Sequence, residues 1–327
     1  MNILVTGGAG YIGSHFINKT LLQSEARIVV VDNFSQGKNN IINDSRVVYE
    51  EIDLINKTAL KKVFADNNFD IVIHFAALAS VPDSVIRPKE YYYNNVIGAL
   101  NLLDCMLEFR VKKIINSSSA SVFGEPTTEI ITEDHPKTPT NPYGSTKLVI
   151  EYMLREYHLA YGIQSVSFRY FCACGCDESL KVGEYHQPET HVIPCIIETL
   201  LGKREKFYVY GNDYPTPDGS GIRDYIHVND LAEVHRLAME KLLGGIEVCE
   251  FFNMGIIKGF SVFELIKVAE KVSGKKLNYE VKPRRPGDPS KLIADSTRAQ
   301  QWLGWKPKYT SIEQIFESAY NFFKLKA

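Results

Sequence analysis

Hydrophobic runs and amphipathic stretches alternate along the first half of the chain. Short runs rich in Val and Ile are typical of strands that are buried on both faces of a parallel sheet. Such strands are predicted at residues 2–6, 27–32, 47–53, 70–77, 113–119 and 164–170. Helical periodicity predicts helices at residues 11–23, 57–65, 89–108 and 142–161. This alternation predicts right-handed βαβ units and therefore an α/β fold with a doubly wound parallel sheet.

Beyond residue 170 the pattern is less regular. Helices are predicted at residues 192–202, 228–243, 261–273, 296–303 and 311–324, with a strand at 250–255 and a Gly-, Pro- and Asp-rich loop at 211–221. No flexible linker accompanies the change of pattern. We therefore expect a dinucleotide-type domain at residues 1–170, to which segments near 225–255 return, and a smaller α/β substrate-binding domain at residues 171–327.

A glycine-rich loop joins the first predicted strand to the first predicted helix. Gly7, Gly10 and Gly13 have G-x-x-G-x-x-G spacing. Glycines allow the backbone to turn sharply and to approach a pyrophosphate, which the helix N-terminus attracts through free N–H groups and its dipole. Asp32 ends the next strand, where a carboxylate accepts hydrogen bonds from a ribose and repels a 2′-phosphate. The loop predicts an NAD site, and a purely structural tight turn is the alternative.

A second motif opens the predicted helix at 142–161. Tyr143 and Lys147 are four residues apart, so they share one face of the helix. A phenol titrates near pH 10, and a cation about 5 Å away lowers its pKa by roughly two units. We therefore expect Tyr143 to exchange a proton with a sugar hydroxyl near neutral pH, with Ser119, at a strand end, bonded to the same hydroxyl. The alternative for Tyr143 and Lys147 is a surface pair at i and i+4 with no function, and the alternative for Ser119 is a turn at the end of the strand.

Composition and charge exclude several classes of function. The chain has 37 Lys and Arg against 39 Asp and Glu, so it lacks the overall basic field of a nucleic-acid-binding protein. No apolar run approaches the ~18 residues of a membrane span, and the N-terminus has no signal-peptide pattern. We expect no nucleic-acid partner, no membrane segment and a cytoplasmic location.

The cysteines lack the spacing of a common metal site. Six are present and no two have C-x-x-C spacing, so we expect no metal site. Cys172, Cys174 and Cys176 alternate along the chain. We interpret them as small residues in a passage from strand to loop, and a metal or redox role is the alternative.

Several segments together carry a family resemblance. They are Thr-Gly-Gly-Ala-Gly-Tyr-Ile-Gly-Ser-His at 6–15, His-Phe-Ala-Ala at 74–77, Asn-Asn-Val at 94–96, Ser-Ser-Ser-Ala-Ser-Val-Phe-Gly at 117–124, Pro-Tyr-Gly-Ser-Thr-Lys at 142–147, Arg-Tyr-Phe at 169–171 and Arg-Arg-Pro-Gly-Asp at 284–288. The most specific is the segment 210–228, which ends in Ile-Arg-Asp-Tyr-Ile-His-Val. Over essentially its whole length the chain resembles the extended short-chain dehydrogenase/reductase superfamily and, within it, the UDP-glucose (UDP-galactose) 4-epimerases.

The resemblance implies a Rossmann domain that holds NAD and a second domain that holds a UDP-sugar. It implies that Tyr143, Lys147 and Ser119 are catalytic. The implied cofactor-binding residues are Gly7, Gly10, Tyr11, Ile12, Gly13, Asp32, Asn33, Asp53, Leu54, Phe75, Ala76, Ala77, Asn94, Tyr143, Lys147 and Tyr170. The implied substrate-binding residues are Ser119, Tyr143, Cys172, His191, Val192, Tyr210, Arg223, Tyr225, Arg285, Asp288 and Leu292.

The implied reaction is NAD-dependent 4-epimerisation of a UDP-hexose through a 4-keto intermediate, by an isomerase with tightly bound NAD. The substrates are UDP-glucose and UDP-galactose, and the intermediate size of Leu292 at the sugar gate also admits N-acetylated forms. The resemblance further implies a homodimer through helices 89–108 and 142–161. Two departures from the family pattern are Cys172, where an asparagine is usual, and Ala79, where a lysine is common. A third is Pro82-Asp83 in place of a Gly-Glu pair.

Two alternative functions remain at this point. A dehydratase or decarboxylase of the same superfamily is disfavoured, because Ala120 and Ser121 occupy the positions where the eliminating enzymes carry an acid. A non-catalytic NAD-binding regulator is the second alternative, and the presence of Ser119, Tyr143 and Lys147 argues against it.

Overall fold

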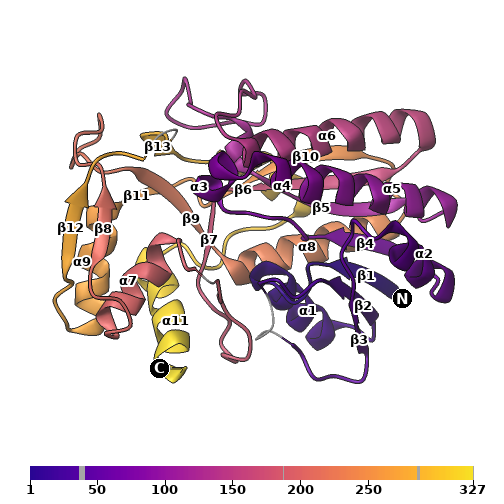
Figure 1. Cartoon of the computed structure of the whole chain (residues 1–327), viewed down its shortest axis with the longest axis horizontal. Helices are drawn as coiled ribbons and strands as arrows, with labels where there is room; N and C mark the ends of the chain where they lie inside the picture. Colours follow the sequence, from indigo (N-terminus) through magenta and orange to yellow (C-terminus); the bar gives the residue numbers. More distant parts are fainter. Residues whose placement is uncertain (37–40, 187, 286–287, 327) are drawn as a thin grey trace.

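A seven-stranded parallel sheet forms the centre of the molecule (Figure 1). The structure is a computed structural model that describes residues 1–36, 41–186, 188–285 and 288–326. The sheet has the spatial order β10-β6-β5-β4-β1-β2-β3, and every neighbouring pair is parallel. Its strands are β1 (Asn2–Thr6), β2 (Arg27–Asp32), β3 (Val47–Glu51), β4 (Ile71–His74), β5 (Lys113–Ser119), β6 (Gln164–Tyr170) and β10 (Cys249–Met254). This is the doubly wound Rossmann order with one strand added, and it confirms the predicted fold class.

Helices cover both faces of this sheet, which explains why its strands are apolar at consecutive positions. Along β1, Ile3 and Val5 pack in a core with α1 and α8, whereas Leu4 packs in a second core with α2, α5 and α6. The helices of the first face are α1 (Tyr11–Gln23), α8 (Val228–Leu243) and α10 (Thr297–Leu303). Those of the second face are α2 (Lys57–Asp66), α5 (Gly98–Glu108) and α6 (Pro142–Tyr161).

The remaining chain builds a smaller unit beside the carboxyl ends of the sheet strands (Figure 1). Its four-stranded sheet consists of β7 (Cys172–Cys174), β9 (Ile222–His227), β11 (Gly259–Ser261) and β13 (Lys291–Leu292), and a separate pair consists of β8 (Phe207–Tyr210) and β12 (Tyr279–Lys282). The helices α7 (Val192–Leu200), α9 (Val262–Ser273) and α11 (Ile312–Leu325) pack with these strands in a third core. In the part of the chain that the structure describes, no helix is long and apolar enough to span a bilayer.

The helix predicted at residues 89–108 is divided into three parts. These are α4 (Pro88–Tyr91), a π-helical segment η1 (Tyr92–Ile97) and α5. Within η1, Asn95 is buried and donates from Nδ2 to the carbonyl of Leu78 and to Thr146 Oγ1. Asn94, a predicted cofactor residue, lies in the same π-helical segment, next to Asn95. The bond of Asn95 to Thr146 holds this segment against α6. Two short helices complete the fold, α3 (Val81–Ile86) and the 3₁₀ turn η2 (Ala120–Val122).

A buried ion pair holds α6 against the sheet. Glu151 of α6 accepts two hydrogen bonds from the guanidinium of Arg169 on β6, at 2.8 and 2.7 Å. Ser118 of β5 donates to the same carboxylate at 2.6 Å. Both charged side chains are 3% exposed, so each depends on the other for charge compensation. The pair fixes the helix that carries Tyr143 and Lys147.

We expect Glu151→Gln to lower the free energy of unfolding by about 3–5 kcal/mol, because the substitution leaves the Arg169 charge buried and unpaired. Urea unfolding followed by circular dichroism measures the change. The matched control is Glu250→Gln, which breaks the exposed ion pair of Glu250 with Arg298 and is expected to cost less than about 1 kcal/mol. Equal effects of the two substitutions would contradict a structural role for the buried pair.

Candidate active site

The glycine-rich loop between β1 and α1 packs closely against the end of β4. Gly7 has a φ of +71°, and a Cβ atom there would lie 2.5 Å from the amide nitrogen of Ala76. A Cβ atom at Gly13 would lie 2.4 Å from the carbonyl oxygen of Gly7. Both contacts are with backbone atoms, which cannot move aside, so these two positions require glycine.

The N-terminus of α1 is open for an anion. Its N-cap is Gly10, no side chain caps the first turn, and that turn contains no acidic residue. Asp32, at the end of β2, accepts hydrogen bonds from the N–H groups of Ala9 (3.0 Å) and Phe34 (2.9 Å). Free N–H groups beside a close-packed glycine loop, with a strand-end carboxylate next to them, fit the pyrophosphate and ribose of a dinucleotide.

The other predicted cofactor residues follow the carboxyl ends of the neighbouring strands. Asn33 donates to Asp53 at 3.0 Å, which links the ends of β2 and β3. The N–H groups of Phe75 and Ala76, after β4, donate to the Thr6 carbonyl at 2.9 and 3.1 Å. The structure thus brings the following predicted residues to one edge of the sheet: Gly7, Gly10, Ile12, Gly13, Asp32, Asn33, Asp53, Leu54, Phe75, Ala76 and Ala77.

Two predicted cofactor residues use their hydroxyl groups in contacts with other elements. Tyr11 is buried, and its hydroxyl donates to the carbonyl of Gly175 at 2.5 Å, beyond β7. The hydroxyl of Tyr170 lies 2.6 Å from Nε2 of His235 on α8. Burial raises the pKa of both phenols, so both hydroxyls stay protonated. Tyr11 thus joins the start of α1 to the segment after β7, and Tyr170 joins β6 to α8.

Tyr143 lies in the first turn of α6, close to the end of β5. Asn141 caps this helix by accepting from the N–H of Gly144 at 2.9 Å. Lys147 is 1% exposed, and its ammonium donates to the Ser117 carbonyl at 2.6 Å while lying 5.9 Å from the centre of the Tyr143 ring. The hydroxyl of Ser119 lies near enough to that of Tyr143 to lower its pKa. The structure therefore brings the three predicted catalytic side chains together.

The expected lowering of the Tyr143 pKa by Lys147 is wrong for the chain by itself. Burial raises the pKa of Tyr143, and the nearby hydroxyl of Ser119 opposes this rise only in part. Burial also lowers the pKa of Lys147 to about 8, although Glu151 acts in the opposite direction. The sequence estimate considered the distance between the two groups and omitted the loss of solvent around both of them.

Two predicted substrate arginines lie on the smaller unit. Arg223 of β9 donates to Asp288 Oδ1 at 2.6 Å. The guanidinium carbon of Arg285 lies 3.8 Å from the centre of the Tyr210 ring, at the end of β8. The remainder of the Arg-Arg-Pro-Gly-Asp segment, Pro286 and Gly287, lies outside the described residues.

Strand pairing places further predicted residues beside Arg223. Leu292 of β13 is aligned with Arg223, and it packs against the apolar cluster that includes Val122 of η2, next to Ser119. Cys172 of β7 is aligned with Tyr225 of β9. Burial raises the pKa of the Cys172 thiol to about 12, so it is a neutral and weak hydrogen-bond donor. β13 thus connects the arginine-bearing sheet, through Leu292, with the apolar cluster that includes Leu148 of the catalytic helix.

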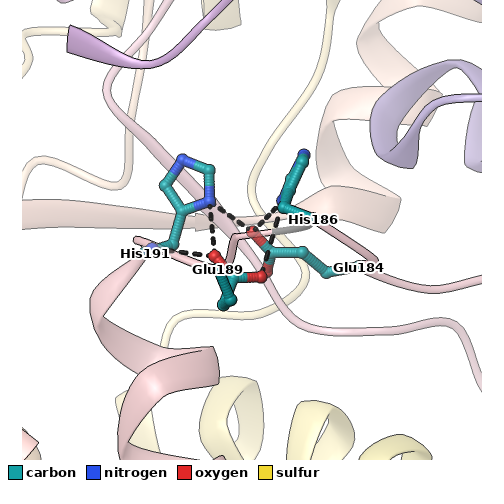
Figure 2. A group of neighbouring side chains, drawn as sticks. All are labelled: Glu184, His186, Glu189 and His191. Carbon is teal, nitrogen blue, oxygen red and sulfur yellow. Dashed lines mark hydrogen bonds and ion pairs between the residues drawn. The ribbon is translucent and has the colours of Figure 1, made fainter. Parts of the chain in front are cut away.

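His191 and Val192 lie where α7 begins, and His191 is its N-cap. His191 does not stand alone, because it contacts Glu184 and Glu189, which also contact His186 (Figure 2). The sequence analysis missed this cluster. The alternation of two glutamates and two histidines between residues 184 and 191 is the pattern that could have revealed it.

Comparison with known proteins agrees with this geometry. The family model described as GDP-mannose 4,6 dehydratase matches residues 4–318. The UDP-glucose 4-epimerase of Halalkalibacterium halodurans is 49% identical over 324 residues, which cover 99% of this chain and 96% of that relative. The UDP-glucose 4-epimerase of Lacticaseibacillus casei is 43% identical over 321 residues, with 98% and 96% covered.

Solved structures show the same relationship. A crystal structure of a UDP-glucose 4-epimerase matches with a TM-score of 0.95 and 44% identity, over 100% of this chain and 98% of that one. The UDP-glucose 4-epimerase of Bifidobacterium longum in complex with NAD+ and UDP matches with a TM-score of 0.94 and 39% identity, over 99% and 98%. Full-length identity and a shared fold lead to one assignment: the chain belongs to the UDP-glucose 4-epimerase family of the extended short-chain dehydrogenase/reductases.

Proposed function

We propose that this chain is an isomerase that interconverts UDP-glucose and UDP-galactose at carbon 4 through a 4-keto intermediate, with NAD as its resident cofactor. The observation that carries this proposal is the meeting of Tyr143, Ser119 and Lys147 at the sheet edge where the glycine loop opens α1. Relatives that match nearly the full chain carry the name of this activity, UDP-glucose 4-epimerase. Bound NAD+ supplies the hydride acceptor for carbon 4 and a positive charge that favours the Tyr143 phenolate.

Tyr143 is the proposed acid and base of the reaction. Its phenolate oxygen accepts the proton of the 4′-hydroxyl of the sugar in one half of the reaction, and the resulting phenol returns that proton in the other half. Ser119, close to Tyr143, is proposed to form a hydrogen bond with the same sugar hydroxyl and so to orient it. Lys147 is held by the Ser117 carbonyl, so its charge stays fixed on the catalytic face of α6.

The nucleotide end of the substrate is proposed to bind the smaller unit. Arg223 and Arg285 offer planar forks that suit a diphosphate. Arg223 is already oriented by Asp288 and is 16% exposed, so little side-chain freedom remains to be lost on binding. The neutral thiol of Cys172 donates weakly, which leaves the two arginines as the main partners of the diphosphate. A sugar held through its nucleotide remains free to turn over between the two half-reactions.

The test uses purified protein with no added NAD, incubated separately with UDP-galactose, UDP-N-acetylgalactosamine and UDP-arabinose. We expect UDP-glucose to form from UDP-galactose, because the cofactor is regenerated in each turnover and stays bound. Chromatographic separation of the 4-epimers measures the products, and heat-denatured protein is the control. Absence of any 4-epimer would reject the proposal. A 4-keto-6-deoxy product would instead indicate a dehydratase, in spite of Ala120 and Ser121 beside Ser119.

The proposed assembly is a homodimer through the surface formed by α3, η1 and α6. Large apolar side chains are exposed on these neighbouring elements, and they are Val85, Ile86, Tyr92, Tyr93, Tyr152, Leu159 and Tyr161. Burial of such a patch against a second copy would remove it from water. Light scattering on the purified protein tests the proposal, and the mass of a single chain at micromolar concentration would contradict it. The proposed cytoplasmic location stays a prediction, which cell fractionation tests.

A further inference from the structure

Four side chains with metal-ligating atoms meet between β7 and α7 (Figure 2). They are Glu184, His186, Glu189 and His191, and one ligand atom from each lies within 4.8 Å of all the others. We propose that these four residues form a site for one divalent transition-metal ion of the zinc type. No step of the proposed reaction requires a metal, although one ligand, His191, is also among the residues that the family resemblance assigns to the substrate.

Three of the four distances between histidine and glutamate atoms match those of a tetrahedral zinc site, and the fourth, between His191 and Glu184, is a hydrogen-bond distance that would have to lengthen. His191 Nδ1 lies 2.8 Å from Glu184 Oε1 and 3.3 Å from Glu189 Oε1. His186 Nδ1 lies 3.5 Å from both Glu184 Oε1 and Glu189 Oε2. Zinc bonds to nitrogen and oxygen of about 2.0–2.2 Å place the ligand atoms of a tetrahedron about 3.3–3.6 Å apart. In Figure 2 both imidazoles turn Nδ1 toward the carboxylates and the other ring nitrogen away.

Hydrogen bonds leave one imidazole nitrogen of this cluster unsatisfied. Nδ1 of His186 is buried, and it has no hydrogen-bond partner among the described residues. Its two contacts of 3.5 Å are longer than the usual N–H···O distance of about 2.7–3.2 Å. Buried polar atoms in folded proteins nearly always have a partner. A metal ion between Nδ1 and the two carboxylates would supply it.

In the chain alone the histidines balance the charge of the cluster: burial lowers the pKa of both, but Glu184 and Glu189 outweigh it and raise the pKa to about 9 for His186 and about 10 for His191. A cation could take the place of these protons. The side chains of Glu184 and Glu189 are only 6% and 4% exposed. Within the described part of the chain, neither carboxylate forms an ion pair with a lysine or an arginine; both are paired with histidines alone. Buried carboxylates need charge compensation. One divalent ion neutralises both of them and leaves the imidazoles in the neutral form that binds metal.

The mixture of ligands selects the class of ion. Calcium and magnesium take oxygen ligands, whereas imidazole with carboxylate suits zinc and its neighbours in the first transition series. The backbone N–H groups of Thr190 and His191 donate to Glu189 Oε1 at 2.7 and 2.8 Å, which orients that carboxylate. Four protein ligands make a closed, structural site. The ion would fix the segment 184–191 to the start of α7.

The proposal is tested on untagged protein that has been treated with a chelator and desalted. Titration with Co²⁺ is expected to give one ion per chain and the intense visible absorption of tetrahedral cobalt, and equimolar Zn²⁺ is expected to abolish that absorption. Zn²⁺ is also expected to raise the thermal unfolding temperature of the metal-free protein. Failure to bind Co²⁺ or Zn²⁺ at one ion per chain would overturn the proposal and leave a histidine–glutamate ion-pair cluster.

Two variants sharpen this test. His186→Gln removes one ligand that is 27% exposed, and it is expected to lower Zn²⁺ affinity at least ~100-fold, since even an outer partner of a ligand is worth about 10–100-fold. The control His158→Gln removes an imidazole at the end of α6, where Nδ1 contacts the Ile163 carbonyl, and is expected to bind Zn²⁺ like the parent chain. Circular dichroism verifies that both fold. Equal affinity of the two variants would also overturn the proposal, and none of these readouts depends on epimerase turnover.

Discussion

Substitution of Tyr143 by phenylalanine is expected to lower kcat for 4-epimerisation by about 10²–10⁴-fold, the usual contribution of a positioned acid and base. The phenol is half-buried, close to Ser119 and 5.9 Å from Lys147, so no other described hydroxyl of α6 occupies its place. Steady-state assays with UDP-galactose measure kcat, and chromatography of the denatured protein measures the NAD that it retains. Both NAD content and KM are expected to stay close to those of the parent chain.

The matched control is Tyr91→Phe, which removes a buried phenol of α4. Tyr91 is 1% exposed, and its hydroxyl donates to the Ser80 carbonyl at 2.7 Å, so its loss affects stability by about 1 kcal/mol and leaves kcat unchanged. Full turnover of the Tyr143 variant would refute the proposed mechanism. If the chain were instead a non-catalytic NAD-binding regulator, both the Tyr143→Phe and the Tyr91→Phe variants would keep its biological effect.

Gly7→Ala is expected to abolish the retention of NAD. The alanine Cβ would lie 2.5 Å from the Ala76 nitrogen, so the loop must move away from β4 and its N–H groups leave their position at the start of α1. Chromatography of nucleotides released from the purified variant is expected to show less than a tenth of the NAD that the parent chain carries. Epimerase activity is then expected only when NAD is added.

Gly162→Ala separates this effect from backbone strain. Gly162 caps α6 with a φ of +68°, close to the +71° of Gly7, but a Cβ atom there meets nothing within 4 Å. The control variant is expected to lose about 1–2 kcal/mol of stability from the left-handed backbone alone and to keep its NAD. Equal loss of NAD in both variants would show that strain, and not the close approach to Ala76, explains the effect.

The sequence predicted the large sheet well because β1, β2 and β4 are built on runs of buried apolar residues. β1, β2, β5 and β6 begin and end at the predicted residues, although the buried centres of β5 and β6 also contain polar side chains such as Asn116 and Ser167. Tyr143, Lys147 and Ser119 were also predicted to meet, because helix spacing and the parallel strand ends fix their neighbourhood. The roles of the individual binding residues remain predictions that the variants above examine.

The short strands of the smaller unit could not be predicted. β7 has three residues and β13 two, so neither has a period that can be read from the chain. β12 alternates between exposed and half-buried residues, and β9 carries the charged pair Arg223-Asp224. These segments are strands because partners distant in sequence pair with them. The metal-type cluster escaped notice for a related reason, since only the fold of the loop directs all four side chains to one point.

The return of β10 to the large sheet determines how the chain can be divided. β10 pairs with all seven residues of β6 except Gln164, and α8, which precedes it, covers the face of the sheet that α1 shares. A fragment that stops at residue 170 would therefore lack both, and would expose an unpaired strand edge together with an apolar sheet face. Unpaired edges of this kind promote association between chains. During synthesis, about 80 further residues must be added after β6 before β10 can complete the large sheet. The incomplete sheet is vulnerable to aggregation for that interval.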